Sequence, residues 1–183
     1  MILGLDISTS ITGATILDRH SDVLYCQAWR TDKKDLSFYQ KLDIIRDKAC
    51  FMKIQYPIES IFIEEPLNMF AAGRSSAQVI SKIQRFNGAC CWIIREVFNI
   101  EPNYINASTA RKLCGITIKR GQKAKEIVLE HVLENEKKFK VQYTKKGNPV
   151  KGVYDKADSL VIARAGYYLK NRSHDHEINQ RPT

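Results

Sequence analysis

The sequence predicts an α/β fold in which a mixed β-sheet is flanked by helices. Apolar, β-branched runs with short polar turns fill the first 30 residues, and strand-like runs then alternate with amphipathic segments. With 183 residues, of which 44% are apolar, the chain is long enough to bury one large core. We therefore expect one domain over residues 1–170, followed by a polar, flexible tail over 171–183.

The first half of the chain should form four strands and one helix. Three strands are expected at Met1–Ser8, Ile11–Leu17 and Val23–Trp29, and their tight connections favour an antiparallel meander. From Phe38 to Met52 apolar residues recur at helical spacing, which predicts an amphipathic helix that ends at Tyr56-Pro57. The wholly apolar run Ser60–Ile63 is typical of a strand buried on both faces.

The second half is expected to be mainly helical. A long helix is predicted over 75–98, and because its middle is apolar all round, part of it should face a partner. A strand at 104–106, an N-cap at Ser108 or Thr109, and helices over 123–133 and 155–169 complete the elements. Residues 136–151 carry six lysines around Gly147-Asn148-Pro149, so we expect a basic, turn-rich insert rather than packed structure.

Composition points to an acidic partner inside the cell. The chain has 29 Lys and Arg against 20 Asp and Glu, a formal net charge of +9, and nucleic acid is the commonest partner of such a protein. No apolar run approaches the roughly 20 residues that span a bilayer, and no leader follows Met1, so we expect no membrane partner and a cytoplasmic location. The five cysteines show no C-x-x-C pair and are interpreted as small buried thiols in a reducing compartment.

Four carboxylates stand out as candidate catalytic groups. Asp6 lies in the first strand between apolar neighbours, Glu64 follows the buried strand, and Asp155 and Asp158 share one side of a helix start. Each acid taken alone is most simply a cap or a turn residue. Together they suggest a cation site, since a buried unpaired charge costs several kcal/mol.

The donor chemistry favours hard divalent ions. Carboxylate oxygens without a histidine or cysteine cluster favour Mg²⁺, or Mn²⁺, over zinc. Two such ions about 3.5–4 Å apart can stabilise both the attacking water and the departing 3′ oxygen of a phosphodiester. The pattern therefore predicts hydrolysis of a nucleic-acid backbone.

Three segments of this chain resemble the RuvC family of Holliday junction resolvases, which have the RNase H-like fold. The segments are Ile2-Leu3-Gly4-Leu5-Asp6-Ile7-Ser8-Thr9-Ser10 with Thr12-Gly13, then Phe62-Ile63-Glu64-Glu65, then Asp155-Lys156-Ala157-Asp158-Ser159-Leu160-Val161-Ile162-Ala163. Their order and approximate spacing cover nearly all of the chain. The resemblance implies an RNase H-like mixed sheet of the five predicted strands, flanked by helices, in a single RuvC-like nuclease domain.

The same resemblance implies the role of each acid. Asp6 would bridge two metal ions, Glu64 would close the fourth strand as a ligand, and Asp155 and Asp158 would complete the metal site. Lys123 is similar to the family's basic residue that approaches the cleaved phosphate. The family also implies a homodimer packed through helix 75–98 that nicks a four-way DNA junction symmetrically, in a bacterial or phage-infected cell.

Some features depart from the family pattern. Asp6-Ile7-Ser8-Thr9 stands where bacterial members have Asp-Pro-Gly-Ser, and Glu65 competes with Glu64 for the ligand role, although strand register favours Glu64. Leu67 or Phe70 would present an apolar side chain to the junction centre, or else belong to the core. The long insert suggests a divergent branch, viral or phage.

Basic side chains are candidate contacts to DNA phosphates, with a plain solvated surface as the alternative for any one of them. The candidates, to which we add Phe70 as an apolar contact, are Arg74, Lys82, Arg85, Lys119, Arg120, Lys123 and Lys125. The run His174-Asp175-His176-Glu177 imitates a metal site but lies in the polar tail, and Ser8-Thr9-Ser10 is interpreted as a turn.

Other functions remain open at this point. The acids also suit a nuclease that cuts other branched DNA or RNA–DNA hybrids, or a non-catalytic DNA-binding relative. Gly4-Leu5-Asp6 with Thr12-Gly13 suits the phosphate-gripping hairpin of actin-like phosphotransferases as well. Such enzymes need two domains and a late glycine-rich loop, which this sequence lacks.

Overall fold

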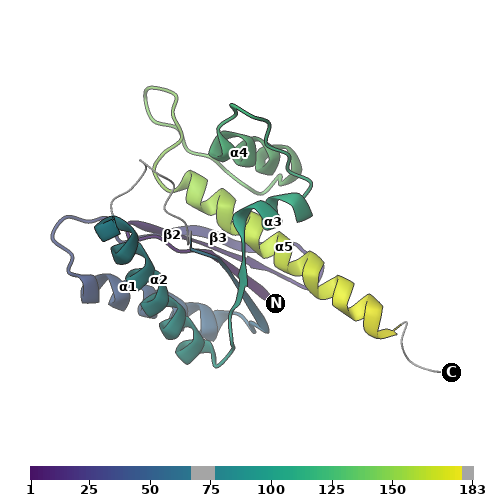
Figure 1. The fold of residues 1–183 in the computed structure, drawn as a ribbon, viewed down its shortest axis with the longest axis horizontal. Helices are drawn as coiled ribbons and strands as arrows, with labels where there is room; N and C mark the ends of the chain where they lie inside the picture. Colours follow the sequence, from purple (N-terminus) through teal and green to yellow (C-terminus); the bar gives the residue numbers. More distant parts are fainter. Residues whose placement is uncertain (67–76, 179–183) are drawn as a thin grey trace.

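A mixed, five-stranded sheet forms the centre of the molecule, in the strand order β3-β2-β1-β4-β5 (Figure 1). The computed structural model describes residues 1–66 and 77–178, the last six of them by their backbone alone. The strands are β1 (Ile2–Asp6), β2 (Ile11–Leu17), β3 (Val23–Arg30), β4 (Ser60–Glu64) and β5 (Asn103–Ile105). β1, β2 and β3 are antiparallel neighbours, whereas β4 runs parallel to both β1 and β5. The predicted meander and mixed sheet are confirmed.

Helices cover both faces of the sheet. They are α1 (Phe38–Gln55), α2 (Ala77–Phe98), α3 (Ala107–Leu113), α4 (Ala124–Asn135) and α5 (Val153–Ile178). Figure 1 shows α1 and α2 together on one side, while α5 crosses the other side with α3 and α4 beside it. Within the described residues, no helix combines the length and apolar character that crossing a membrane requires.

Strand alternation divides the core between the two faces. Leu3 and Leu5 of β1 and Ile61 and Ile63 of β4 pack in the cluster formed with α1 and α2. Phe62, the residue between the two isoleucines, packs instead in the cluster formed with α3, α4 and α5. Successive side chains of a strand point to opposite faces. Glu64, which follows Ile63, and Asp6, which follows Leu5, therefore face α5.

Glycines allow α5 to lie directly against the sheet. A Cβ atom added to Gly4 of β1 would come within 2.5 Å of the Ala163 nitrogen, and one added to Gly13 of β2 would come within 1.9 Å of the Asp155 carbonyl oxygen. On the helix side, a Cβ atom at Gly166 would overlap the Phe62 ring at 2.3 Å. Helix and sheet are therefore closer than a side chain at any of these positions would allow.

One hydrogen bond fixes the register of α5 on β2. The buried hydroxyl groups of Thr15 and Ser159 lie 2.8 Å apart, so each satisfies the other inside an apolar layer. This contact and the glycine contacts hold α5 against the sheet from Asp155 to Gly166.

Several element boundaries differ from the sequence prediction. The N-cap of α3 is Asn106, whose side chain accepts a hydrogen bond from the Ser108 backbone, and not Ser108 or Thr109. Lys123 precedes α4 as its N-cap rather than lying inside the helix. α5 was predicted to end at Leu169 and continues to Ile178, since no glycine or proline interrupts the sequence there.

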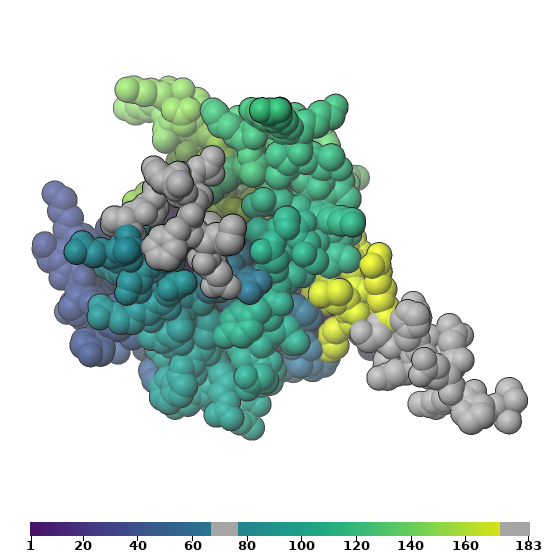
Figure 2. Space-filling view, in the orientation of Figure 1, coloured from purple at the N-terminus to yellow at the C-terminus, as the bar shows by residue number. Residues whose placement is uncertain are grey.

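The basic insert (residues 136–151) is a folded hairpin, which corrects the expectation that it lacks packed structure. Tyr143 and Pro149 form an antiparallel bridge, and the Val150 amide donates to the Gln142 carbonyl at 2.9 Å. Phe139 is only 7% exposed in the core beside α5. Figure 2 shows the insert in light green at the same end of the molecule as α4.

The cysteines are free thiols, as expected, although not all of them are buried. Cys90 and Cys91 are buried on α2, Cys26 and Cys114 are half-buried, and Cys50 is exposed on α1. The expectation that all five are buried thiols is therefore wrong for Cys50, which faces away from the buried stripe of Ile45, Ala49 and Met52.

The contact of α5 with Gly13 can be tested by substitution. Gly13→Ala should destabilise the protein by about 3 kcal/mol or more, because overpacking typically costs 1–3 kcal/mol and the clash here is with backbone. Gly88→Ala on α2 is the control, since no neighbour lies within 4 Å of the added atom and a stabilisation of about 0.5–1 kcal/mol is expected. Chemical denaturation measures both, and equal effects would contradict the close packing of α5.

Candidate active site

Asp6 and Glu64 lie side by side at one edge of the sheet. They are the last residues of the parallel neighbours β1 and β4, and the preceding residues, Leu5 and Ile63, are paired partners. Neighbouring strands are about 4.8 Å apart, and strand alternation directs both carboxylates towards α5. The same alternation explains why Glu64, and not Glu65, shares the face of Asp6.

The start of α5 brings the other two acids to this edge. Gly13 pairs with Asp6 across the β1–β2 ladder and touches the backbone of Asp155. Asp158 is three residues further along, on the same side of the helix, and is only 9% exposed. Three elements that are distant in sequence thus bring four carboxylates to one place.

The electrostatics show how strongly the acids interact. Burial, followed by the negative charges of Glu64, Asp158 and Asp155, raises the pKa of Asp6 well above its usual value. Burial, followed by the charge of Asp158, raises the pKa of Glu64 to about 7. Burial also raises the pKa of Asp158 to about 6 and that of Asp155 to a smaller extent. The cluster holds more negative charge than its surroundings neutralise.

Two basic residues, Lys125 and Arg111, each lower the pKa of more than one of the acids. Lys125, in the first turn of α4, lowers the pKa of all four acids, and Arg111 of α3 lowers those of Glu64 and Asp158. Lys123, the residue singled out from the sequence, is exposed and forms an ion pair with Glu126 of its own helix at 2.9 Å. Arg111 is not among the residues predicted from the sequence, and Lys125 is predicted there only as a DNA contact. Their helical positions were predictable, but their orientation towards the acids depends on how α3 and α4 pack on α5.

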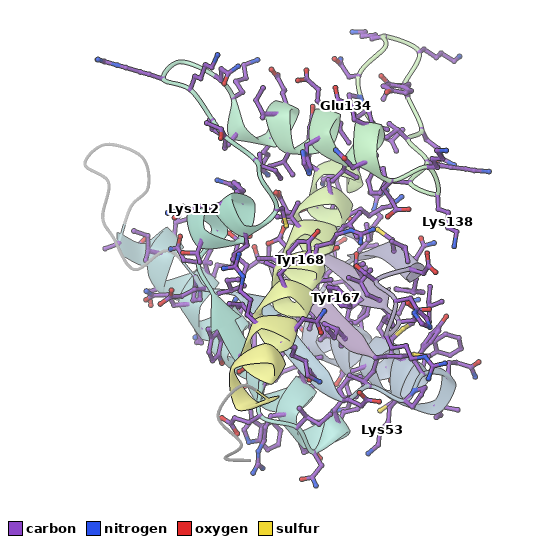
Figure 3. The ribbon with its side chains drawn as sticks, turned by 90° about the vertical axis from the view of Figure 1, so that its right-hand side faces the viewer. Lys53, Lys112, Glu134, Lys138, Tyr167 and Tyr168 are labelled. Carbon is purple, nitrogen blue, oxygen red and sulfur yellow. The ribbon has the colours of Figure 1, made fainter. Side chains whose placement is uncertain are left out.

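The remaining predicted contacts are spread over the surface. Lys82 and Arg85 are exposed on α2, where Arg85 lies 4.7 Å over the Phe38 ring, and Lys119 and Arg120 are exposed between α3 and α4. Arg74, Phe70 and Leu67 lie outside the described residues, as do the side chains of the run from His174 to Glu177. Figure 3 shows α5 running between Lys112 of α3 on one side and Lys138 of the insert on the other.

The donor chemistry fits hard cations, although the geometry is not preset. In the described part of the chain, no group of three or more His, Cys, Asp or Glu side chains is arranged as a ready-made metal site. The four acids nevertheless offer only oxygen donors, and burial, followed by repulsion from the other three acids, raises the pKa of Asp6. A divalent ion would remove that repulsion, so the fit is one of charge and donor type.

Comparison with known proteins identifies the fold of this chain but no related family or curated protein. No protein-family model matches this sequence, and no curated protein matches it either. Among solved structures, Thermus thermophilus RuvC in complex with a Holliday junction substrate is 14% identical, with a TM-score of 0.65 over 93% of this chain and 94% of that chain. A second structure of T. thermophilus RuvC gives a TM-score of 0.62 at 14% identity over 94% of this chain and 96% of that chain.

A eukaryotic structure agrees with these two. The yeast mitochondrial Holliday junction resolvase Ydc2 is 12% identical, with a TM-score of 0.56 over 97% of this chain and 83% of that chain. The chain therefore has the RuvC fold, of the RNase H-like type. The resemblance first seen in three sequence segments is confirmed at the level of the fold.

The raised pKa values predict how stability varies with pH in the absence of metal. Glu64 and Asp158 titrate near 7 and 6 in the folded protein, against ordinary values of 4.5 and 3.8. The folded state therefore binds more protons than the unfolded state. The contribution of these two groups to stability is fully present below about pH 4 to 4.5, near their ordinary pKa values, and is lost as the pH rises through 7. The unfolding temperature, measured with chelator from pH 5 to 8, should fall, and Glu64→Gln should flatten the profile. A flat profile for the parent protein would contradict the shifts.

Proposed function

We propose that this protein is a Mg²⁺-dependent endonuclease that resolves four-way DNA junctions by paired, symmetric nicks. The observation that carries the proposal is the meeting of Asp6, Glu64, Asp155 and Asp158 at one sheet edge, within a fold shared with RuvC. One of the compared structures is described as a complex of RuvC with a Holliday junction substrate, which supports branched DNA as the ligand.

In this proposal the acidic residues bind metal and the basic residues near them attract the phosphate. The four carboxylates would hold two Mg²⁺ ions, or Mn²⁺, and when bound these ions would supply charge stabilisation and an activated water. Lys125 and Arg111 are placed to attract a phosphate towards the acids, which by themselves would repel it. Burial of Asp158 excludes water from part of the site and strengthens each of these interactions.

Removing one acid should separate catalysis from binding. Asp6→Asn, Glu64→Gln and Asp158→Asn should each lower cleavage of a four-way junction at least about 100-fold, because even the outer partners of metal ligands typically account for 10- to 100-fold. Junction binding should persist, since a negative charge has been removed. Gel assays should compare junction, fork, flap and RNA–DNA hybrid substrates with Mg²⁺ and with chelator.

The control and a second readout make this test specific. Glu65→Gln makes the same change one residue beyond the end of β4 and should leave cleavage within about threefold of the parent. If Glu65→Gln abolished cleavage while Glu64→Gln did not, Glu65 would be the metal ligand instead of Glu64. At pH 8, Mg²⁺ should raise the unfolding temperature of the parent by several degrees more than that of Asp158→Asn. Normal cutting by all three acid variants would refute the proposed site, and binding without nicking of any substrate would indicate a non-catalytic protein.

We also propose that two copies pair through α2, so that two active sites face opposed strands. Trp92 is 60% exposed on this helix, and Tyr39 of the neighbouring α1 is 74% exposed. A hollow of about 390 Å³ beside Trp92, lined in part by Tyr39 and Leu42 of α1, continues the apolar surface. Exposed apolar patches of this kind are typical of protein interfaces.

A charge placed at the centre of this surface should disrupt the dimer. Trp92→Glu should weaken self-association at least about 100-fold, because an aromatic anchor at an interface commonly contributes 2 kcal/mol or more and an unpaired buried charge adds to the loss. Leu133→Glu, on the exposed face of α4, is the matched control and should leave the dimer intact. Sedimentation equilibrium measures both, and a monomeric parent protein would contradict the proposal.

A further inference from the structure

A basic cavity lies beside the candidate active site, between the edge strand β3, the basic insert and the start of α5. Its volume is about 550 Å³. Of the residues that the structure describes, four with cationic side chains and none with an acidic one line it, together with two glutamines. The cations are Arg30, Lys140, Lys151 and Lys156.

Little of this positive charge is neutralised. Asp32 forms ion pairs with both Arg30 and Lys151, and their hydrogen bonds hold its pKa well below the usual range. Lys156 donates to the Lys140 carbonyl at 3.3 Å and lies 4.8 Å above the Phe139 ring, but neither contact supplies a negative charge. Within the described residues, Lys140 and Lys156 form no ion pair with a carboxylate. The cavity therefore presents a net positive wall to any ligand.

The wall is held in place rather than loosely attached. The insert pairs with itself through the Tyr143–Pro149 bridge and packs the buried Phe139 against the core beside α5. The ion pair between Lys151 and Asp32 joins the end of the insert to the loop that follows β3. A preorganised set of cations binds an anion with less loss of conformational freedom than mobile lysines would.

The position of the cavity relative to the acids follows from the strand register. Asp6 is paired with Gly13, and Gly13 with Ala28, which lines the cavity and contacts Gly152 at the start of α5. Two strand spacings of about 4.8 Å separate Asp6 from Ala28, which gives about 10 Å. Lys151 also lowers the pKa of Asp155, so the two sites share one electrostatic field.

We propose that this cavity is a phosphate-binding subsite for the DNA strand that is cut at the acids. A nucleic-acid strand advances about 3.4 Å per nucleotide along the helix axis, and successive phosphates along its backbone are about twice as far apart, so about 10 Å corresponds to phosphates one to two nucleotides from the cleaved one. This inference rests on the proposed nuclease function. In that function, the basic insert would fix the register of the cleaved strand across β1, β2 and β3.

A pair of charge reversals tests the proposal. Lys140→Glu alters the cavity, whereas Lys145→Glu makes the same charge change in the exposed turn of the same insert, outside the cavity. Binding of a four-way junction is measured without divalent metal as a function of salt. Lys140→Glu should reduce the slope of log affinity against log salt by about 1 and weaken binding about eightfold at 0.1 M salt, as the loss of one phosphate contact predicts. Lys145→Glu should alter the slope by much less.

A modified substrate locates the contact. Single methylphosphonates, which remove one backbone charge, are placed one to four nucleotides to either side of the cut. Those at one to two nucleotides on one side should weaken binding by the parent and have no further effect on Lys140→Glu. Equal behaviour of the two lysine variants, or additive effects of Lys140→Glu with every methylphosphonate, would overturn the subsite while leaving the proposed function intact. A parent protein that neither binds nor nicks branched DNA would overturn both.

Discussion

The direct contact between α5 and the sheet is the constraint on which the candidate site depends. Gly4 and Gly13 on the strands and Gly166 on the helix leave no space for a side chain, so the helix backbone lies against β1 and β2. A helix held off by even one methyl group would carry Asp155 away from the end of β1. The hydrogen bond between Thr15 and Ser159 then sets the rotation of the helix, which determines that its acidic side faces the strand ends.

The same contact has an energetic cost. Burial of the carboxylates, followed by repulsion between them, raises the pKa values of Asp6, Glu64 and Asp158, which means that the charged cluster opposes folding when no cation is present. Two apolar clusters, one on each face of the sheet, offset this cost. A protein that keeps such repulsion at one point of an otherwise well-packed fold has a destabilised site of the kind that functional sites commonly show.

Much of this arrangement could be predicted from sequence, because strands and buried helices leave strong local patterns. The alternation around Asp6 and the apolar run before Glu64 placed both acids at strand ends, and the spacing of Asp155 and Asp158 placed them on one helix side. What could not be predicted depends on tertiary packing. Arg111 and Lys125 affect the acids only because α3 and α4 pack against α5, and the insert is ordered only because Phe139 finds a place in the core. Lysine-rich composition carries no signal of either contact.

The distribution of charge completes the argument, since the chain combines a formal charge of +9 with an acidic centre. A polyanion approaching four carboxylates would be repelled unless cations on both sides outweighed them. α3 and α4 supply such cations on one side of α5 and the insert supplies them on the other, as Figure 3 shows for Lys112 and Lys138. On the proposed function, the acids would act on one phosphate while basic residues hold the neighbouring phosphates. That division between positive flanks and a negative centre would need cations on both sides of α5, so the insert would then be part of the site.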